Sequence, residues 1–117
     1  MKDQEILFKR LKELKNYWVQ TSLEGLDEKA DLIWSDYEDE YRYLQNNLSS
    51  DESKQAYEKV LDEVIRGVIH SILVILDGGD EVTDKLNIAL INEDTKKSLK
   101  EGIALHEEFF SYLLDSE

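Results

Sequence analysis

The sequence predicts a mainly α-helical domain: four or five helices in a bundle-like arrangement, with one short extended or β segment near residues 86–91. Three observations predict this fold class. Apolar residues recur at steps of three and four along most of the chain. Proline is absent, so no proline interrupts a long helix. Short breaks rich in Gly, Asn, Asp and Ser separate the periodic stretches. The length of 117 residues suits one domain over 1–117.

The first two helices are expected over residues 3–20 and 27–48. In the first, apolar residues from Ile6 to Trp18 recur on one side. The second has the clearest amphipathic pattern, because its apolar positions fall in a sector about 100° wide and its acidic residues lie outside it. Those apolar positions are Ala30, Ile33, Trp34, Tyr37, Tyr41, Leu44 and Leu48. We therefore expect this sector to face the core.

A third helix is expected from about Asp51 to Leu76. Ser49-x-x-Glu52 matches a capping box before it, and Gly78-Gly79 supplies the left-handed residue that ends it. Its last five residues are apolar all round, which predicts the buried centre of the domain. The remaining core-facing positions are Tyr57, Leu61, Val64, Ile65 and Val68. A glycine inside this helix, Gly67, predicts the close approach of another helix or a ligand.

The chain after this helix is less regular. Alternation of apolar residues over 86–91 predicts an extended segment packed on helices, or a small hairpin. A helical turn is expected from Asn92 to Glu101, and Gly102 then separates it from a final helix. The core-facing residues of that final helix are expected to be Ile103, Phe109, Phe110, Leu113 and Leu114.

The formal net charge is −13, and it is unevenly distributed. Residues 1–20 carry +2, residues 21–63 carry −9, and residues 64–117 carry −6. Such a surface repels nucleic-acid phosphate and anionic lipid and attracts cationic protein surfaces. We therefore expect a basic protein partner, with no direct contact to nucleic acid or membrane. The absence of cysteine, of a signal-like apolar core and of a spanning apolar run predicts a cytoplasmic protein.

The candidate partner-binding residues lie in the predicted 27–48 helix. Leu32, Asp36, Asp39, Glu40 and Tyr43 share a sector away from its core stripe. Carboxylates around an exposed aromatic ring suit Arg and Lys side chains, because the ring adds contact area and cation–π attraction. Tyr43 or Leu32 would then anchor the contact. The alternative is that these residues form an ordinary solvated helix face.

The candidate metal ligands are His70, His106, Asp77 and Asp80, and each has a simpler structural explanation. Neither histidine belongs to a Glu-x-x-His pair, and position 110 is Phe where a His-Glu-x-x-His motif would need histidine. The acidic turn lacks the alternating ligands of an EF-hand loop. We therefore expect hydrogen-bonded histidines at the core edge and an aspartate that caps neighbouring backbone. No cofactor is expected. The sequence also lacks recognisable catalytic motifs, so we expect no enzymatic activity.

Three strings in the C-terminal half resemble small bacterial proteins: Arg66-Gly67-x-x-His70, Leu76-Asp77-Gly78-Gly79 and Leu105-His106-Glu107-Glu108-Phe109-Phe110. In size and acidity the chain is similar to immunity proteins of polymorphic toxin systems. The resemblance implies stoichiometric inhibition of a toxin, often a basic nuclease, through an acidic surface. The other hypotheses are a DNA-mimic or regulatory protein, a metal-dependent hydrolase or metal-binding bundle, and a homodimer that buries the apolar end of the third helix.

Overall fold

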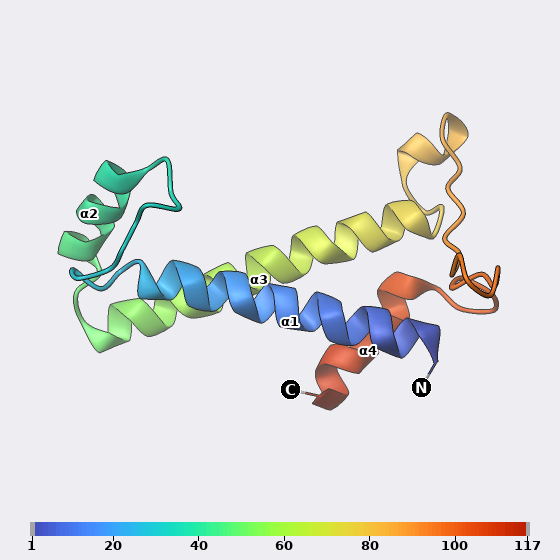
Figure 1. Ribbon diagram of the computed structural model, residues 1–117, viewed down its shortest axis with the longest axis horizontal. Helices are drawn as coiled ribbons and strands as arrows, with labels where there is room; N and C mark the ends of the chain where they lie inside the picture. The colour runs from blue at the N-terminus through green and yellow to red at the C-terminus, as the bar shows by residue number, and fades with distance from the viewer. Residues whose placement is uncertain (1, 117) are drawn as a thin grey trace. The chain divides into compact units, whose positions relative to one another are not determined.

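The computed structural model describes residues 2–116, and the fold is mainly α-helical, as the sequence predicts. Its elements are α1 (Asp3–Glu24), α2 (Glu38–Asn47), α3 (Asp51–Leu76), the short 3-10 helix η1 (Glu81–Asp84) and α4 (Leu105–Ser116) (Figure 1). These elements form two compact units. One comprises Met1–Glu13 and Arg66–Glu117, and the other comprises Leu14–Ile65, so α1 and α3 contribute residues to both. The expectation of one domain over 1–117 stays a prediction.

The unit formed by 1–13 and 66–117 is built around a small apolar core. Its buried residues are Phe8 of α1, Leu73 of α3, and Leu105, Phe109 and Leu113 of α4. The three α4 residues are four positions apart, so they lie along one side of the helix. The ring centroids of Phe8 and Phe109 are 5.4 Å apart. The prediction that Phe110 and Leu114 also face the core is wrong, since more than half of each is exposed.

The bounds of α3 match the predicted Asp51–Leu76, because local signals fix both of its ends. The cap differs in detail: Ser50, rather than Ser49, accepts a hydrogen bond from the backbone N–H of Ser53 at 3.1 Å. At the other end Gly78 has a φ of +80°, which confirms the predicted left-handed stop. The ammonium of Lys100 donates to the carbonyl O of Leu76 at 2.6 Å and so satisfies one of the last carbonyls of α3.

The expected burial of the apolar end of α3 is wrong. Of the last five residues of α3 only Leu73 is buried. Val64, Val68 and Ile72, all expected in the core, are each more than half exposed. The apolar side chains extend around more of the helix than the neighbouring elements cover. The packing expected at Gly67 is also missing, since a Cβ built there meets nothing within 4 Å among the described residues.

The unit formed by 14–65 departs most from the predicted helices. The helix expected over 27–48 is wrong in its first half, because α2 begins only at Glu38. In the preceding loop the Oδ1 of Asp27 accepts from Lys29 N, the Oδ1 of Asp31 from Ile33 N, and the Oγ of Ser35 from Tyr37 N. Such bonds to the backbone two residues ahead compete with helical hydrogen bonds. Three of them in succession keep 27–37 out of the helix.

The irregular segment before α4 contains a small hairpin. Ile91 and Ser98 form an antiparallel β-bridge, and Leu99 N donates to Leu90 O at 2.9 Å. This confirms the predicted extended segment near 86–91. The helical turn expected from Asn92 to Glu101 is wrong. The side chain of Asn92 accepts from Asp94 N, and Lys96 adopts a positive φ of 62°, so the chain reverses here instead.

Gly25 is required where the chain leaves α1, and its replacement is a direct test of the packing in this unit. A Cβ at Gly25 would lie 2.5 Å from Cε1 of Tyr41, whose ring is held edge-on to Trp34. We expect Gly25→Ala to lower the free energy of unfolding by about 1–2 kcal/mol in urea titrations, because the ring must move. In a Tyr41→Leu background the same change should cost clearly less. An equal cost in both backgrounds would contradict this explanation.

Candidate protein-binding surface

The loop over 27–37 and α2 are joined by hydrogen bonds that fix the loop backbone. Nη1 of Arg42 donates to Glu28 O at 3.1 Å. Nε2 of Gln45 donates to Gly25 O at 2.8 Å and to Asp27 O at 3.1 Å. The ring of Tyr41 contacts that of Trp34, with centroids 5.5 Å apart. Side chains on the loop and on α2 are therefore displayed from one connected scaffold.

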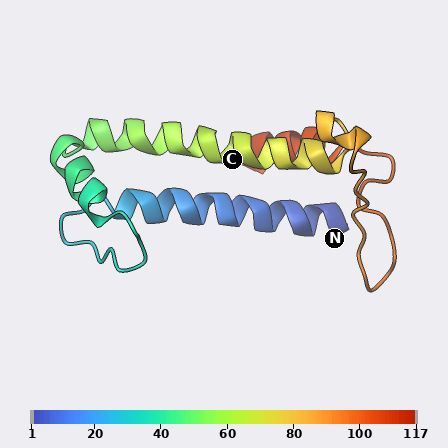
Figure 2. The ribbon, with the colours of Figure 1, turned by 90° about the horizontal axis from the view of Figure 1, so that it is seen from above.

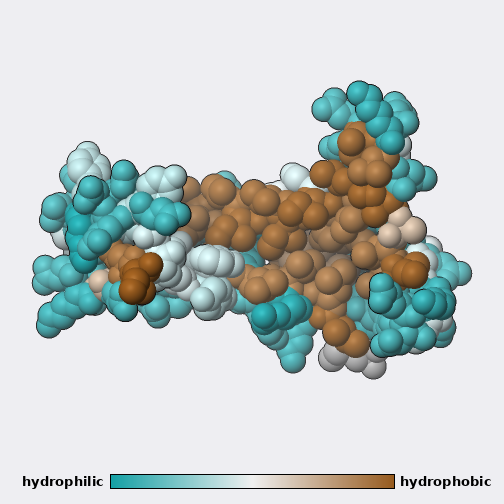
Figure 3. All heavy atoms as spheres, turned by 45° about the horizontal axis from the view of Figure 1, so that its top comes forward, coloured by the Kyte–Doolittle hydropathy of each residue, from teal (hydrophilic) through white to brown (hydrophobic). Residues whose placement is uncertain are grey.

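This scaffold exposes aromatic and apolar side chains next to carboxylates. Tyr43 is 67 % exposed. Asp39 and Glu40 precede it by four and three residues on α2, so all three share one side of the helix. On the loop, Ile33 is 90 % exposed. We call the exposed set the acidic aromatic surface, and it consists of Ile33, Trp34, Asp36, Tyr37, Asp39, Glu40 and Tyr43. In Figure 3 a small hydrophobic patch appears among hydrophilic residues in this part of the chain.

Two of the five predicted binding residues need correction. Leu32 is only 5 % exposed, so it packs inside the unit and is not available as an anchor. Asp36 is exposed as predicted, but it lies in the loop and not on a helix. Ile33, which the helical pattern assigned to the core, takes the exposed position instead. The residue that indicates this exposed position of Ile33 is Asp31. Its side chain accepts a hydrogen bond from Ile33 N and so turns the chain.

The surface is strongly negative. Residues 27–48 contain seven acidic and two basic residues. Arg42 forms an ion pair with Glu38, with Nη2 and Oε1 3.4 Å apart. Across residues 2–116, Asp36, Asp39 and Glu40 form no ion pair. These carboxylates can therefore pair with cationic groups of a partner without first breaking a bond within the chain.

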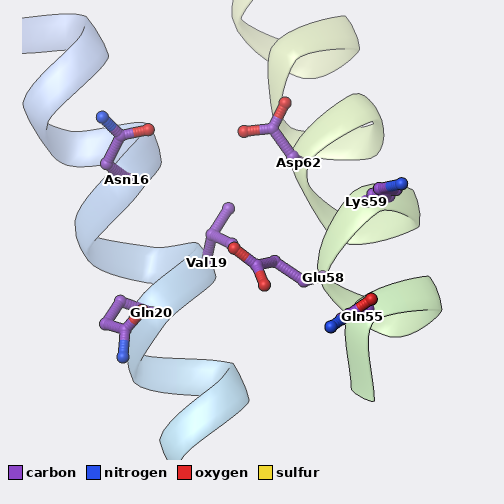
Figure 4. Close-up of a pocket in the computed structure, with 7 residues that line it drawn as sticks. All are labelled: Asn16, Val19, Gln20, Gln55, Glu58, Lys59 and Asp62. Atoms are coloured by element: carbon purple, nitrogen blue, oxygen red, sulfur yellow. The ribbon is translucent and has the colours of Figure 1, made fainter. Parts of the chain in front are cut away.

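A polar cavity of about 500 Å³ lies between α1 and α3 in the same unit (Figure 4). Its lining residues are Asn16, Val19, Gln20, Gln55, Glu58, Lys59 and Asp62. Figure 4 shows Glu58 extending from α3 toward α1. Asp62 already has a structural role, since its Oδ1 lies 2.6 Å from the ammonium of Lys15, which is 1 % exposed. We therefore assign this cavity no ligand.

Three of the candidate metal ligands, Asp77, Asp80 and His106, have structural roles in the other unit, whereas His70 is exposed and not at the core edge as expected. Oδ1 and Oδ2 of Asp77 accept hydrogen bonds from the backbone N–H of Leu105 at 2.9 Å and of His106 at 2.8 Å. Nδ1 of His106 lies 2.6 Å from Oδ2 of Asp77, so this nitrogen carries the proton that it donates. Asp77 thus caps the N-terminus of α4, which confirms the predicted backbone cap. Asp80 caps η1 by accepting from Val82 N.

The cap has an electrostatic consequence. Burial by itself would raise the pKa of Asp77, but the hydrogen bonds from the backbone of His106 and Leu105, and from the His106 ring, outweigh it and lower the pKa below its usual value. The ring of His70 is close to that of His106, with centroids 5.3 Å apart. Within residues 2–116, no group of three or more His, Cys, Asp or Glu side chains is placed to hold a metal ion.

Comparisons with protein-family models, with curated proteins and with solved structures found no match to this chain. Among the described residues, no helix combines the length and the apolar character needed to cross a bilayer.

Proposed function

We propose that this protein binds and masks a basic protein surface through the acidic aromatic surface. The observation that carries the proposal is the combination of exposed rings with carboxylates that lack an ion pair within the described chain. A surface that is only solvated has no need for Ile33 at 90 % exposure in the loop or for Tyr43 at 67 % on α2. Exposed apolar side chains that are surrounded by polar ones are typical of interaction sites.

The two kinds of side chain would contribute differently to binding. Asp36, Asp39 and Glu40 attract a cationic partner over a distance, so they govern the association rate and its dependence on salt. Tyr43 and Ile33 exclude water from the contact and hold the partner, so they govern the dissociation rate. The hydrogen bonds of Arg42 and Gln45 to the loop fix these groups before binding, which reduces the entropy lost on association.

The most concrete form of the proposal is a toxin-neutralising immunity protein whose partner is a basic, nuclease-type toxin. Such an inhibitor works stoichiometrically, and it needs a tight contact as well as a negative field. The exposed rings support this form over a DNA mimic. A DNA mimic would reproduce rows of phosphates and would gain little from the exposed side chains of Ile33 and Tyr43.

Binding can be tested with immobilised protein and a lysate of the cells that produce it, followed by purification of any basic protein retained at low salt. We expect the triple variant Asp36→Lys/Asp39→Lys/Glu40→Lys to reduce the association rate with that protein at least tenfold in surface plasmon resonance. The matched control is Glu93→Lys/Asp94→Lys/Glu101→Lys. This control changes the net charge by the same amount at exposed positions of the other unit, and it should reduce the association rate much less.

The anchor is tested by Tyr43→Ala, which should increase the dissociation rate about tenfold or more and leave the association rate nearly unchanged. Equal effects of the two triple variants would mean that only overall charge matters. Retention of no basic protein at low salt would contradict the proposed function. If this chain is an immunity protein, expression of the captured protein alone should arrest growth, and co-expression with this chain should restore growth.

A further inference from the structure

The helix α3 carries an apolar face that the described chain leaves uncovered. Val60, Val64, Val68 and Ile72 are four residues apart and are each between 51 % and 63 % exposed. Residues at this spacing form a continuous ridge along a helix. Figure 3 shows the hydrophobic band that follows α3. Valine and isoleucine in such a row lose unfavourable contact with water only if another surface covers them.

The same face is free of charge and contains small residues. At about 100° per residue, no charged side chain between Ala56 and Ile75 falls in the sector of roughly 160° around this ridge. Gly67 and Ser71 lie in this sector and are exposed. A Cβ at Gly67 would meet nothing within 4 Å in the described chain. Glycine costs about 1 kcal/mol relative to alanine inside a helix. Any close approach to Gly67 would therefore come from another molecule.

The charges on α3 indicate which molecule fits. Residues 51–65 contain five acidic and two basic residues, whereas residues 66–76 contain one basic residue, Arg66, and none that is acidic. A second α3 running in the opposite direction would place each acidic half beside the neutral to basic half of its neighbour. This arrangement also opposes the two helix dipoles. A parallel pair would instead bring the two acidic halves together.

The chain also leaves many apolar side chains in contact with water. Among the described residues, large hydrophobic side chains that are exposed outnumber the buried ones by 16 to nine. Four of the exposed ones form this row on α3. A second copy of α3 would remove these four side chains from water by covering them with the same row of its own.

We propose that a second copy of this chain covers the face, with the two α3 helices packed antiparallel about a two-fold axis near Gly67. Val64 then packs near Val68 of the second copy, and Val60 packs near its Ile72. The interface is isologous, because the same residues contribute from both sides. The proposal uses residues other than those of the acidic aromatic surface, and it does not depend on the proposed function.

The oligomeric state of the full chain tests the proposal, by sedimentation equilibrium and light scattering between about 1 µM and 1 mM. We expect a dimer that dissociates on dilution. Val64→Lys/Val68→Lys should raise the dissociation constant at least a hundredfold. These lysines make the net charge less negative, so added repulsion between acidic chains cannot explain the loss. The control Leu86→Lys, at a similarly exposed apolar position outside α3, should still dimerise. A chain that stays monomeric at all concentrations overturns the proposal.

Two further variants test the geometry. Gly67→Ala should raise the melting temperature of the dilute monomer, because alanine favours the helix, and should weaken the dimer at least tenfold by separating the helices. If Gly67→Ala instead tightens the dimer, the two α3 helices do not cross near Gly67. The chain has no cysteine, so single-cysteine variants cross-link only where they are placed. Gly67→Cys should form a disulfide-linked dimer on oxidation. Efficient cross-linking of Ser53→Cys instead would show a parallel pair and overturn the antiparallel one.

Discussion

Asp62→Ala is expected to lower the free energy of unfolding by about 3 kcal/mol, the largest effect that we predict for a single substitution. The ammonium of Lys15 is 2.6 Å from Oδ1 of Asp62, and Lys15 is 1 % exposed. Oδ1 of Asn16 accepts a second hydrogen bond from the same ammonium at 2.9 Å. Removal of the Asp62 carboxylate takes this partner away from the Lys15 ammonium, which lies in a site that water hardly reaches. Denaturant titrations followed by circular dichroism measure the loss.

The matched control removes the other partner. Lys15→Met keeps most of the side-chain volume and removes the charge, so it should cost less than Asp62→Ala, because a partly exposed carboxylate is more easily hydrated than a buried ammonium. Asp62 is 30 % exposed at its side chain, which gives it access to water. If Asp62→Ala costs less than about 1 kcal/mol, the pair does not stabilise the fold as we describe.

This buried pair also shows what the sequence could not predict. The periodicity of α1 placed its lysines among the polar positions, but Lys15 is buried while Ile6 and Trp18 are about half exposed. Helical periodicity predicts that a helix is amphipathic, and here it predicted the existence and most of the length of α1. Which side is covered depends on partners distant in the sequence, and Asp62 is 47 residues from Lys15.

The ends of α3 were predictable because their causes are local. A serine cap lies within three residues of the helix start, and Gly78 lies two residues after its end. The loop over 27–37 was not predicted, although its causes are local too. Asp27, Asp31 and Ser35 each bond to backbone two residues ahead, while the apolar residues between them keep a helical period. Periodicity alone could not show which of these tendencies prevails.

The candidate binding surface was predictable in part for the same reason. Asp39, Glu40 and Tyr43 lie within one turn of α2, so their common side follows from helical geometry wherever that helix begins. The burial of Leu32 and the exposure of Ile33 depend on the loop conformation, and the prediction had the two the wrong way round.

The cap by Asp77 could be expected from the sequence, but its partners could not. An aspartate just after the C-terminus of a helix is unfavourable beside the helix dipole, and this indicated a compensating hydrogen bond. The donors at 105 and 106 are distant in the sequence, so no local pattern identified them.

Asp77→Ala is expected to lower the free energy of unfolding by about 2–3 kcal/mol, because it leaves the first N–H groups of α4 without their acceptors. The side chain of Asp77 is 7 % exposed, so water replaces the carboxylate poorly. Hydrogen exchange should increase first at the amides of Leu105 and His106. Asp80→Ala is the matched control, since it removes a similar cap from the four-residue η1 and should cost less.

The stabilisation by Asp77 should also depend on pH in a defined direction. Its hydrogen bonds lower its pKa in the folded protein relative to the unfolded chain, where an aspartate titrates near 3.9. A lowered folded pKa means that the stabilisation is complete above about pH 5 and is lost as the pH falls through the folded value. The difference in unfolding free energy between the natural chain and Asp77→Asn should therefore be constant near neutral pH and shrink in acid. A difference that stays constant down to pH 2 would show that the charge of Asp77 does not contribute, and that the cap acts only through its shape.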